Sequence, residues 1–166
     1  MIGNSRYLMS VLVSSLTNID YDPCNNYNIL DNHWRSTLIH WHMFGPGSAL
    51  DDIPVEWDGW HRLFTNGLST EMPEWCVSFM SCGGFSGLWL GGSHPRLEDG
   101  VVTREMYGSR YDQCSYYRSE PIQVKACPGD YYVYKFTRPT PIFCSVYCLE
   151  CRVTCLGLYF VCLFFS

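Results

Sequence analysis

Cysteine content is the feature that most constrains the fold of this chain. Ten of its 166 residues are cysteine, accompanied by six tryptophans and twelve tyrosines. Reducing compartments keep thiols free, so a cysteine-rich, lysine-poor chain is typical of a secreted protein held together by disulfides. The chain is also long enough for one domain with a modest core of its own, so the bridges supplement that core rather than replace it.

Charge and hydropathy restrict the classes of partner that such a domain can have. The net charge is −5, and the chain has two lysines, nine arginines and no basic run. Nucleic-acid binding requires a basic surface, so we expect no nucleic-acid partner. The apolar stretch at residues 155–165 is shorter than the ~20 residues of a membrane-spanning helix, which argues against a membrane. The expected partners are extracellular proteins or glycans.

The two ends of the sequence differ from its middle. Residues 1–15 contain Arg6, an apolar stretch and two final serines, which indicates a signal peptide; a first buried strand is the alternative. Residues 149–166 form an apolar tail with cysteines and without turn signals. We interpret this tail as a truncated or artificial end of the sequence, and the start of a membrane segment is the alternative.

Residues 21–148 are organised by turns. Segments with glycine or proline, such as 45–48, 91–95 and 128–130, separate short runs that are rich in Val, Trp, Tyr and Phe. The expected strands are residues 59–64, 76–80, 88–90, 101–103, 122–127 and 131–137. We predict a single extracellular domain that is mainly β, loop-rich and stapled by disulfides, with a small α+β arrangement as the alternative.

The segment after Cys127 combines a turn with an aromatic strand. Pro-Gly-Asp follows the cysteine directly and favours a turn. Side chains alternate along a strand, so Tyr131 and Val133 are predicted to face one side, and Tyr134 and Phe136 the other. Packing inside the domain is our interpretation of these aromatics, and stacking on carbohydrate is the alternative.

One pattern resembles a metal site. His40 and His42 would lie on one face of a strand, at a spacing that metal sites use, and Asp51, Asp52 and Glu56 follow in the sequence. Our interpretation of the two histidines is a partly buried aromatic cluster with polar edges, and the metal site is the alternative.

Other candidates for chemistry are weaker. The four cysteines within residues 144–155 lack the paired spacing of zinc knuckles, and an oxidising compartment argues against zinc. Ser86 lacks the second glycine of a nucleophile elbow. The paired carboxylates at 51–52 and 98–99 adjoin turns and are interpreted as solvated loop charges. We therefore assign no catalytic, cofactor-binding or metal-binding residue, and we expect no enzyme and no cofactor.

Five motifs in a fixed order identify a family. They are DPCNNYNILDNHWRST, GWHRLF, MPEWCVSFMSCG, LWLGGSHPRLEDGVVTREMYG and PIQVKACPGDYYVYKFTRPTPIFCSVYC. From Asp22 to Cys148 they resemble the cysteine-rich domain, of eight or ten cysteines, of the uromodulin and zymogen-granule membrane glycoprotein family. The resemblance implies a secreted, non-enzymatic interaction or structural module, which in the family lies beside EGF-like and polymerising modules.

The resemblance also implies a set of bridges. The family pattern has ten cysteines in five bridges, and two cysteines that are partners of each other are replaced here by Met106 and Ser115. One bridge is therefore lost as a whole. Three pairs carry over by position: Cys24 with Cys127, Cys76 with Cys114, and Cys82 with Cys148.

Cys144 is expected to be unpaired within the domain. Its partner in the family pattern stands shortly before Gly59, where this chain has Ile53. Bridges from Cys144 to Cys151, Cys155 or Cys162 remain open as alternatives.

One feature of the family is missing from this chain. In the family, the loop that matches LWLGGSHP carries a high-mannose glycan that acts as a decoy for bacterial fimbrial lectins. Gly91 stands where the acceptor asparagine is expected, and no other N-x-S/T acceptor occurs in the sequence, which argues against a decoy role. The competing hypothesis for function is a metal-dependent hydrolase that uses His40, His42 and nearby carboxylates.

Overall fold

A computed structural model describes residues 21–45, 49–141 and 144–151. The predicted signal peptide and the tail beyond residue 151 lie outside the described residues. The elements in chain order are β1 (Asn28–Asp31), η1 (His33–Arg35), η2 (Trp41–Phe44), β2 (His61–Thr65), β3 (Leu68–Glu71), β4 (Ser86–Leu90), η3 (Leu97–Asp99), β5 (Val101–Arg110), β6 (Gln113–Cys127), β7 (Tyr131–Lys135), β8 (Ser145–Tyr147) and β9 (Glu150–Cys151), where η denotes a 3-10 helix. The prediction of a mainly β, disulfide-stapled domain is confirmed.

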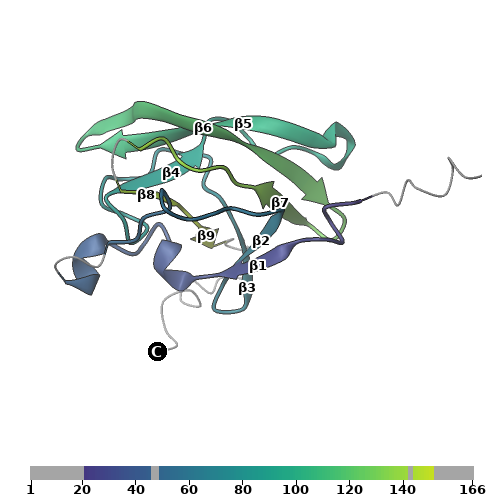
Figure 1. The fold of residues 1–166 in the computed structure, drawn as a ribbon, viewed down its shortest axis with the longest axis horizontal. Helices are drawn as coiled ribbons and strands as arrows, with labels where there is room; N and C mark the ends of the chain where they lie inside the picture. The colour runs from purple at the N-terminus through teal and green to yellow at the C-terminus, as the bar shows by residue number, and fades with distance from the viewer. Residues whose placement is uncertain (1–20, 46–48, 142–143, 152–166) are drawn as a thin grey trace, which may run out of the picture.

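The strands form one curled sheet (Figure 1). Its order is β8-β4-β5-β6-β7-β2-β3-β9, and β1 pairs with β2 in parallel. The long β5–β6 hairpin runs along the top of the view, and β1, β2 and β3 lie below it. No helix in the described part of the chain is long and apolar enough to cross a membrane.

Turn chemistry sets the two shorter hairpins. Asn66 and Gly67 join β2 to β3, and both have positive φ, 52° and 75°. Two positive-φ residues in a two-residue loop match the twist of the flanking strands, and Asn-Gly is the sequence that tolerates them best. Pro128-Gly129-Asp130 joins β6 to β7, where Gly129 and Asp130 have φ of 94° and 60°. The turn predicted after Cys127 is confirmed.

The sheet is closed by one continuous stretch, residues 144–151, which we call the closing segment. Its first part, β8, pairs in parallel with β4 at one end of the sheet, and its last part, β9, pairs with β3 at the other end. Between them, Leu149 exchanges backbone hydrogen bonds with Arg35 and Thr37. The closing segment thus extends three residues past Cys148, to Cys151 at the end of β9.

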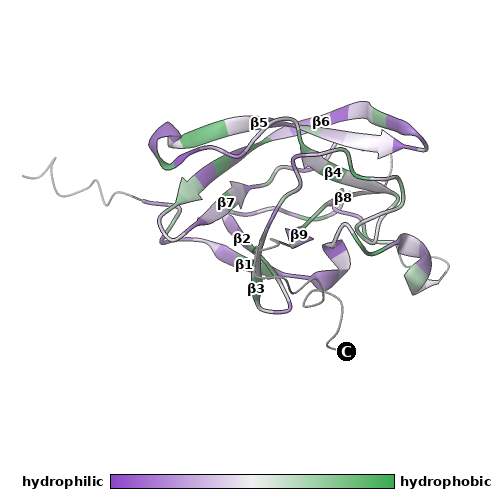
Figure 2. Ribbon diagram, turned by 180° about the vertical axis from the view of Figure 1, so that it is seen from behind, coloured by the Kyte–Doolittle hydropathy of each residue, from purple (hydrophilic) through white to green (hydrophobic). Residues whose placement is uncertain are grey.

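The core has one large cluster and two small ones. The large cluster fills the curl of the sheet and contains the buried side chains of Leu63, Met72, Leu88, Leu90, Met106, Tyr117, Ile122, Val124, Tyr134, Phe136, Tyr147 and Leu149. Each small cluster contains a disulfide: Cys24 and Cys127 in one, Cys82 and Cys148 in the other. Purple and green bands alternate along β6 in Figure 2, as expected of a strand with one buried face.

Strand β7 follows its predicted alternation. Tyr134 and Phe136 belong to the large cluster, while Val133 belongs to the small cluster around Cys24 and Tyr131 packs against it. Packing therefore occupies both faces of this strand.

The prediction of a strand at residues 76–80 is wrong. Residues 76–78 are irregular and residues 79–80 form a turn, in which Met80 has a φ of 66° and its N–H donates a hydrogen bond to the Phe85 carbonyl. The apolar side chain of Val77 is nevertheless buried, in the small cluster around Cys82. A short apolar run thus indicated burial correctly but not backbone conformation, because periodicity alone does not distinguish the two over so few residues.

A buried ion pair fastens the closing segment. The guanidinium of Arg35 donates two hydrogen bonds to the Asp52 carboxylate, at 2.5 and 2.7 Å. Asp52 also accepts from the Tyr147 N–H at 2.8 Å, and its own N–H donates to the Ser145 carbonyl at 2.7 Å. Asp52 is fully buried, so its interpretation as a solvated loop charge is wrong. Its neighbour Asp51 is only partly buried, and the carboxylates at 98–99 are exposed, as expected.

We predict that Asp52→Ala destabilises the domain strongly. The change would leave the Arg35 charge buried without its partner and the Tyr147 N–H without its acceptor, a class of change that costs roughly 3–5 kcal/mol. Urea unfolding of the oxidised protein measures this loss. Glu98→Gln is the matched control, because the Arg96–Glu98 pair is exposed and 3.9 Å apart. Equal unfolding midpoints for the two variants would contradict the role of Asp52.

Candidate functional site

Three disulfides join segments that are distant in sequence. The pairs are Cys24–Cys127, Cys76–Cys114 and Cys82–Cys148, the same pairs that the family resemblance implies, with Cα–Cα distances of 5.6, 5.7 and 5.4 Å. These distances lie in the range that a disulfide requires. The bridges define which surfaces of the domain are held rigidly.

Cys24–Cys127 ties the start of the domain to the foot of β7. The bridge closes a separation of 103 residues, which corresponds to about 4 to 5 kcal/mol in the chain-entropy account. Two polar contacts reinforce it: Tyr131 donates to the Cys24 carbonyl at 2.8 Å, and Lys125 lies 2.7 Å from Asp22. Lys125, together with the Cys24 N–H, lowers the pKa of the Asp22 carboxyl.

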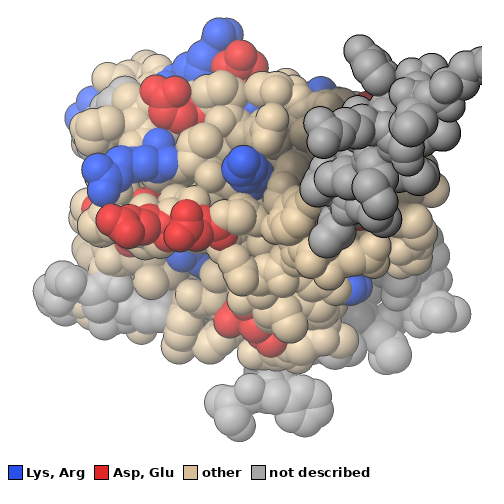
Figure 3. Space-filling view, turned by 45° about the vertical axis from the view of Figure 1, so that its right-hand side comes forward, with Lys and Arg blue, Asp and Glu red and all other residues tan. Residues whose placement is uncertain are grey.

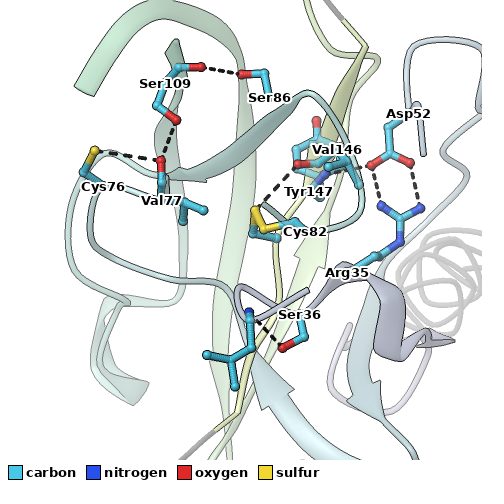
Figure 4. The surroundings of a disulfide bond; sticks show 12 residues. Arg35, Ser36, Asp52, Cys76, Val77, Cys82, Ser86, Ser109, Val146 and Tyr147 are labelled. Atoms are coloured by element: carbon cyan, nitrogen blue, oxygen red, sulfur yellow. Dashed lines mark hydrogen bonds and ion pairs between the residues drawn. A yellow bond between two sulfur atoms is a disulfide. The ribbon is translucent and has the colours of Figure 1, made fainter. Parts of the chain in front are cut away.

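Cys82–Cys148 ties the closing segment to the loop before β4 (Figure 4). Both sulfurs are fully buried beside Val77 and Val146. Gly87 lies against them, and a Cβ at that position would be 2.5 Å from the Cys148 sulfur and 3.2 Å from the Cys82 sulfur. Glycine is therefore required in the middle of β4, because the bridge occupies the space of a side chain.

Cys144 makes no disulfide with any cysteine whose side chain the structure describes. Cys155, Cys162 and the side chain of Cys151 lie outside that part. Burial, together with the Asp51 carboxylate beside it, raises the pKa of the Cys144 thiol. A raised pKa lowers the thiolate fraction at neutral pH and with it the reactivity of the sulfur.

His40 and His42 do not have the strand arrangement that the sequence pattern suggested for a metal site. His40 precedes the 3-10 helix η2 and His42 lies inside it, so the two do not share a strand. Their rings stack on each other, with centroids 4.7 Å apart. Among residues 21–45, 49–141 and 144–151, no group of three or more His, Cys, Asp or Glu is placed to hold a metal. Cys148 cannot serve as a zinc thiolate, because it is bonded to Cys82.

Ser86 serves packing. Its side chain is fully buried at the start of β4 and donates to the Ser109 carbonyl at 3.1 Å. Tyr117 lies within hydrogen-bond distance of both Ser86 and Ser145, at 3.1 and 2.6 Å, so the hydroxyls form a buried network. Burial raises the pKa of Tyr117. A hydroxyl without solvent access has no route to a substrate.

His94 is a polar residue that the sequence analysis did not single out. It lies in the loop between β4 and η3, and its Nδ1 is 2.5 Å from Glu74 Oε1 while its Nε2 is 2.7 Å from the Tyr134 hydroxyl. Its ring also stacks on Tyr132, with centroids 4.1 Å apart. Both ring nitrogens are thus committed, and the residue latches the loop onto β7. The Gly-Ser-His-Pro sequence indicated a turn but gave no signal of these contacts.

Glu74 completes this latch. It accepts hydrogen bonds from the His94 backbone N–H at 2.6 Å and from the His94 ring. Burial would raise the pKa of Glu74, but the contacts with His94 outweigh burial and the pKa lies below its ordinary value.

Gly91 lies at the start of the same loop, at the position where the family resemblance implies a glycan acceptor. Its N–H donates to the Glu105 carbonyl at 2.8 Å, so the backbone still belongs to the sheet. A Cβ at this position would overlap the ring of Tyr107, lying 2.8 Å from its Cδ2, and would approach the Glu105 Cβ to 3.1 Å. The Tyr107 ring thus takes the place of a side chain at 91. Residues 91–93 are exposed, so the loop itself is accessible.

Comparisons with known proteins place this chain beside one family of extracellular glycoprotein domains, as the motifs indicated. Residues 61–149 match the family model described as a uromodulin-like domain. The chain is 38% identical to uromodulin of Mus musculus over 141 residues, and 35% identical to pancreatic secretory granule membrane major glycoprotein GP2 of Mus musculus over 157 residues. These alignments cover 80% and 86% of this chain but 20% and 27% of the relatives. The chain thus spans about a fifth to a quarter of their length.

We predict that Ile53→Cys forms a bridge with Cys144. Asp52 is hydrogen-bonded to Ser145, which places the segment around Ile53 beside the start of the closing segment. The new bridge should raise the thermal midpoint under non-reducing conditions and abolish labelling of Cys144 by a thiol reagent in folded protein. Ile53→Ser controls for loss of the isoleucine. Undiminished labelling of Cys144 would show that another residue occupies the family's cysteine position.

Proposed function

The chain belongs to the uromodulin-like domain family, and from this premise we propose that it is a non-enzymatic interaction module of an extracellular protein. The observation that carries the proposal is the use of its reactive side chains. His94, Ser86 and Asp52 are the kinds of group that enzymes use, yet each is buried or bonded within the fold. They hold the fold together and leave the surface for binding.

The outer surface of the β5–β6 hairpin supports a binding role. Arg110 lies over the rings of Tyr111 and Tyr116, at 5.3 and 5.2 Å from their centroids, and Arg118 lies over Tyr107 at 5.6 Å. Tyr111 and Tyr116 are both exposed. Tyrosine and arginine are the residue types that dominate protein interfaces, because they combine large contact area with directional polar groups.

The distribution of charge favours a protein partner. On the face shown in Figure 3, basic and acidic side chains are interspersed, and most of the surface is uncharged. A mixed surface of this kind suits short-range complementarity with another protein better than attraction to a polyanion.

We further propose that this module acts without the N-glycan of its family. Two observations support this: the sequence has no N-x-S/T acceptor, and the Tyr107 ring fills the space beside Gly91. Recognition then rests on the protein surface, and the lectin-decoy role that the resemblance implies does not apply to this chain.

Restoring the acceptor tests both the compartment and the glycan. Produced in a secretory host, the wild-type protein should show no mass change on treatment with an N-glycan-removing enzyme. Gly91→Asn creates Asn-Gly-Ser and should show such a change, because acceptors are modified in the secretory pathway. The variant should also have a lower thermal midpoint, since the new side chain must displace the Tyr107 ring, and adding Tyr107→Ser should recover part of the loss.

Gly91→Asn combined with Ser93→Ala is the matched control. It carries the same strain beside Tyr107 but lacks the acceptor sequence, so it should lose stability without gaining a glycan. A Gly91→Asn protein without a glycan would contradict the extracellular assignment.

Metal analysis separates this proposal from the competing hydrolase. We expect purified, folded protein to contain less than stoichiometric zinc, and His40→Ala with His42→Ala to leave the metal content unchanged. Stoichiometric zinc that disappears in the double variant would overturn the non-enzymatic proposal in favour of a metal site at η2.

A further inference from the structure

The three bridges differ in their exposure to solvent. Cys82 and Cys148 are fully buried, and Cys24 and Cys127 are 5% and 2% exposed. In the third bridge, Cys76 is half-buried and Cys114 is exposed at the start of β6. A thiolate must reach a sulfur to attack a disulfide, so Cys76–Cys114 is the bridge that an external thiol meets first.

A cleft lies directly beside this bridge. It has a volume of about 600 Å³, and both Cys76 and Cys114 contribute to its lining, together with Phe79, Tyr111 and Asp112. The rings of Phe79 and Tyr111 contact each other, with centroids 5.1 Å apart, and give the cleft an apolar wall next to the sulfurs.

We propose that Cys76–Cys114 is a thiol-exchange site, at which a low-molecular-weight thiol enters this cleft and forms a mixed disulfide with the folded protein. This inference is independent of the proposed function. The thiolate attacks the exposed Cys114 sulfur and forms a new S–S bond. The Cys114–Cys76 bond breaks, and Cys76 leaves as a thiolate that takes a proton from water. The exchange conserves the number of disulfides and needs no other oxidant or reductant.

The fold is built to tolerate this exchange. The bridge closes a separation of 38 residues, shorter than the 66 and 103 of the other two bridges. Neither Cys76 nor Cys114 belongs to any of the three core clusters. Opening it therefore removes the smallest entropic contribution of the three, and neither sulfur is itself part of a core cluster.

The exchange would act on the tip of the β5–β6 hairpin. The tip is the turn at Tyr111 and Asp112, between the last paired residues, Arg110 and Gln113. The bridge ties this tip to residues 76–79, and two further ties are the Phe79–Tyr111 contact and the hydrogen bond from Ser109 to the Val77 carbonyl. Opening the bridge would loosen this tip, which includes the exposed Tyr111.

Differential labelling of the whole oxidised protein tests the proposal. All free thiols are first blocked under native conditions. Glutathione is then added in steps, new thiols are alkylated, and the modified cysteines are located by peptide mapping. We expect adducts and alkylation at Cys76 and Cys114 at least about tenfold faster than at the other two bridges, because access governs exchange. Denaturant should bring all six cysteines to similar rates.

Two further measurements make the outcome decisive. Cys76→Ser with Cys114→Ser should remove the fast labelling and leave the other bridges protected in the native state. Hydrogen exchange of the wild-type protein after glutathione treatment should accelerate in residues 76–79 and 109–116 and stay unchanged in β4 and β7, a readout that does not depend on the variant folding. Equal rates at all three bridges, or faster opening of Cys24–Cys127 or Cys82–Cys148, would overturn the proposal.

Discussion

The fold depends on how the closing segment is held between the two ends of the sheet. Asp52 makes this attachment: its carboxylate pairs with Arg35 and accepts from the Tyr147 N–H, and its backbone N–H bonds Ser145. A buried charge without its partner costs several kcal/mol, so the pair fixes one arrangement of η1, the loop at residue 52 and β8. Once the closing segment is placed, Tyr147 and Leu149 complete the large core cluster.

The disulfides act where the core is thin. The large cluster contains no sulfur bridge and packs mainly through side chains of the sheet, with Met72, Phe136 and Leu149 added from residues next to the strands. The two small clusters, which have few apolar residues, each contain one buried disulfide. Cross-linking the chain there limits the unfolded state at positions where burial contributes little. The third bridge, Cys76–Cys114, holds a surface hairpin instead. The two buried bridges thus belong to the core of the module, and the third belongs to the surface that is available for exchange or binding.

Sequence patterns revealed the fold class and the turn after Cys127, because turn residues and alternating aromatics carry their information locally. The bridges came from the resemblance, since cysteine spacing alone does not determine connectivity. The pair Arg35–Asp52 was missed: an aspartate next to a turn has the same local signature whether it is solvated or buried, and only the partner on η1 distinguishes the two. The same holds for His94, whose contacts with Glu74 and Tyr134 come from separate strands and loops. The prediction that His40 and His42 share one face of a strand was wrong for a related reason, because a two-residue spacing does not establish a strand.

A disulfide map of the protein produced in a secretory host tests the account most directly. Proteolysis without reduction, followed by mass spectrometry of the linked peptides, identifies each pair without reference to coordinates. We expect linkages between Cys24 and Cys127, Cys76 and Cys114, and Cys82 and Cys148, as in the structure. A linkage of Cys148 to any cysteine other than Cys82 would contradict the account, because the closing segment could not then lie between β4 and β3.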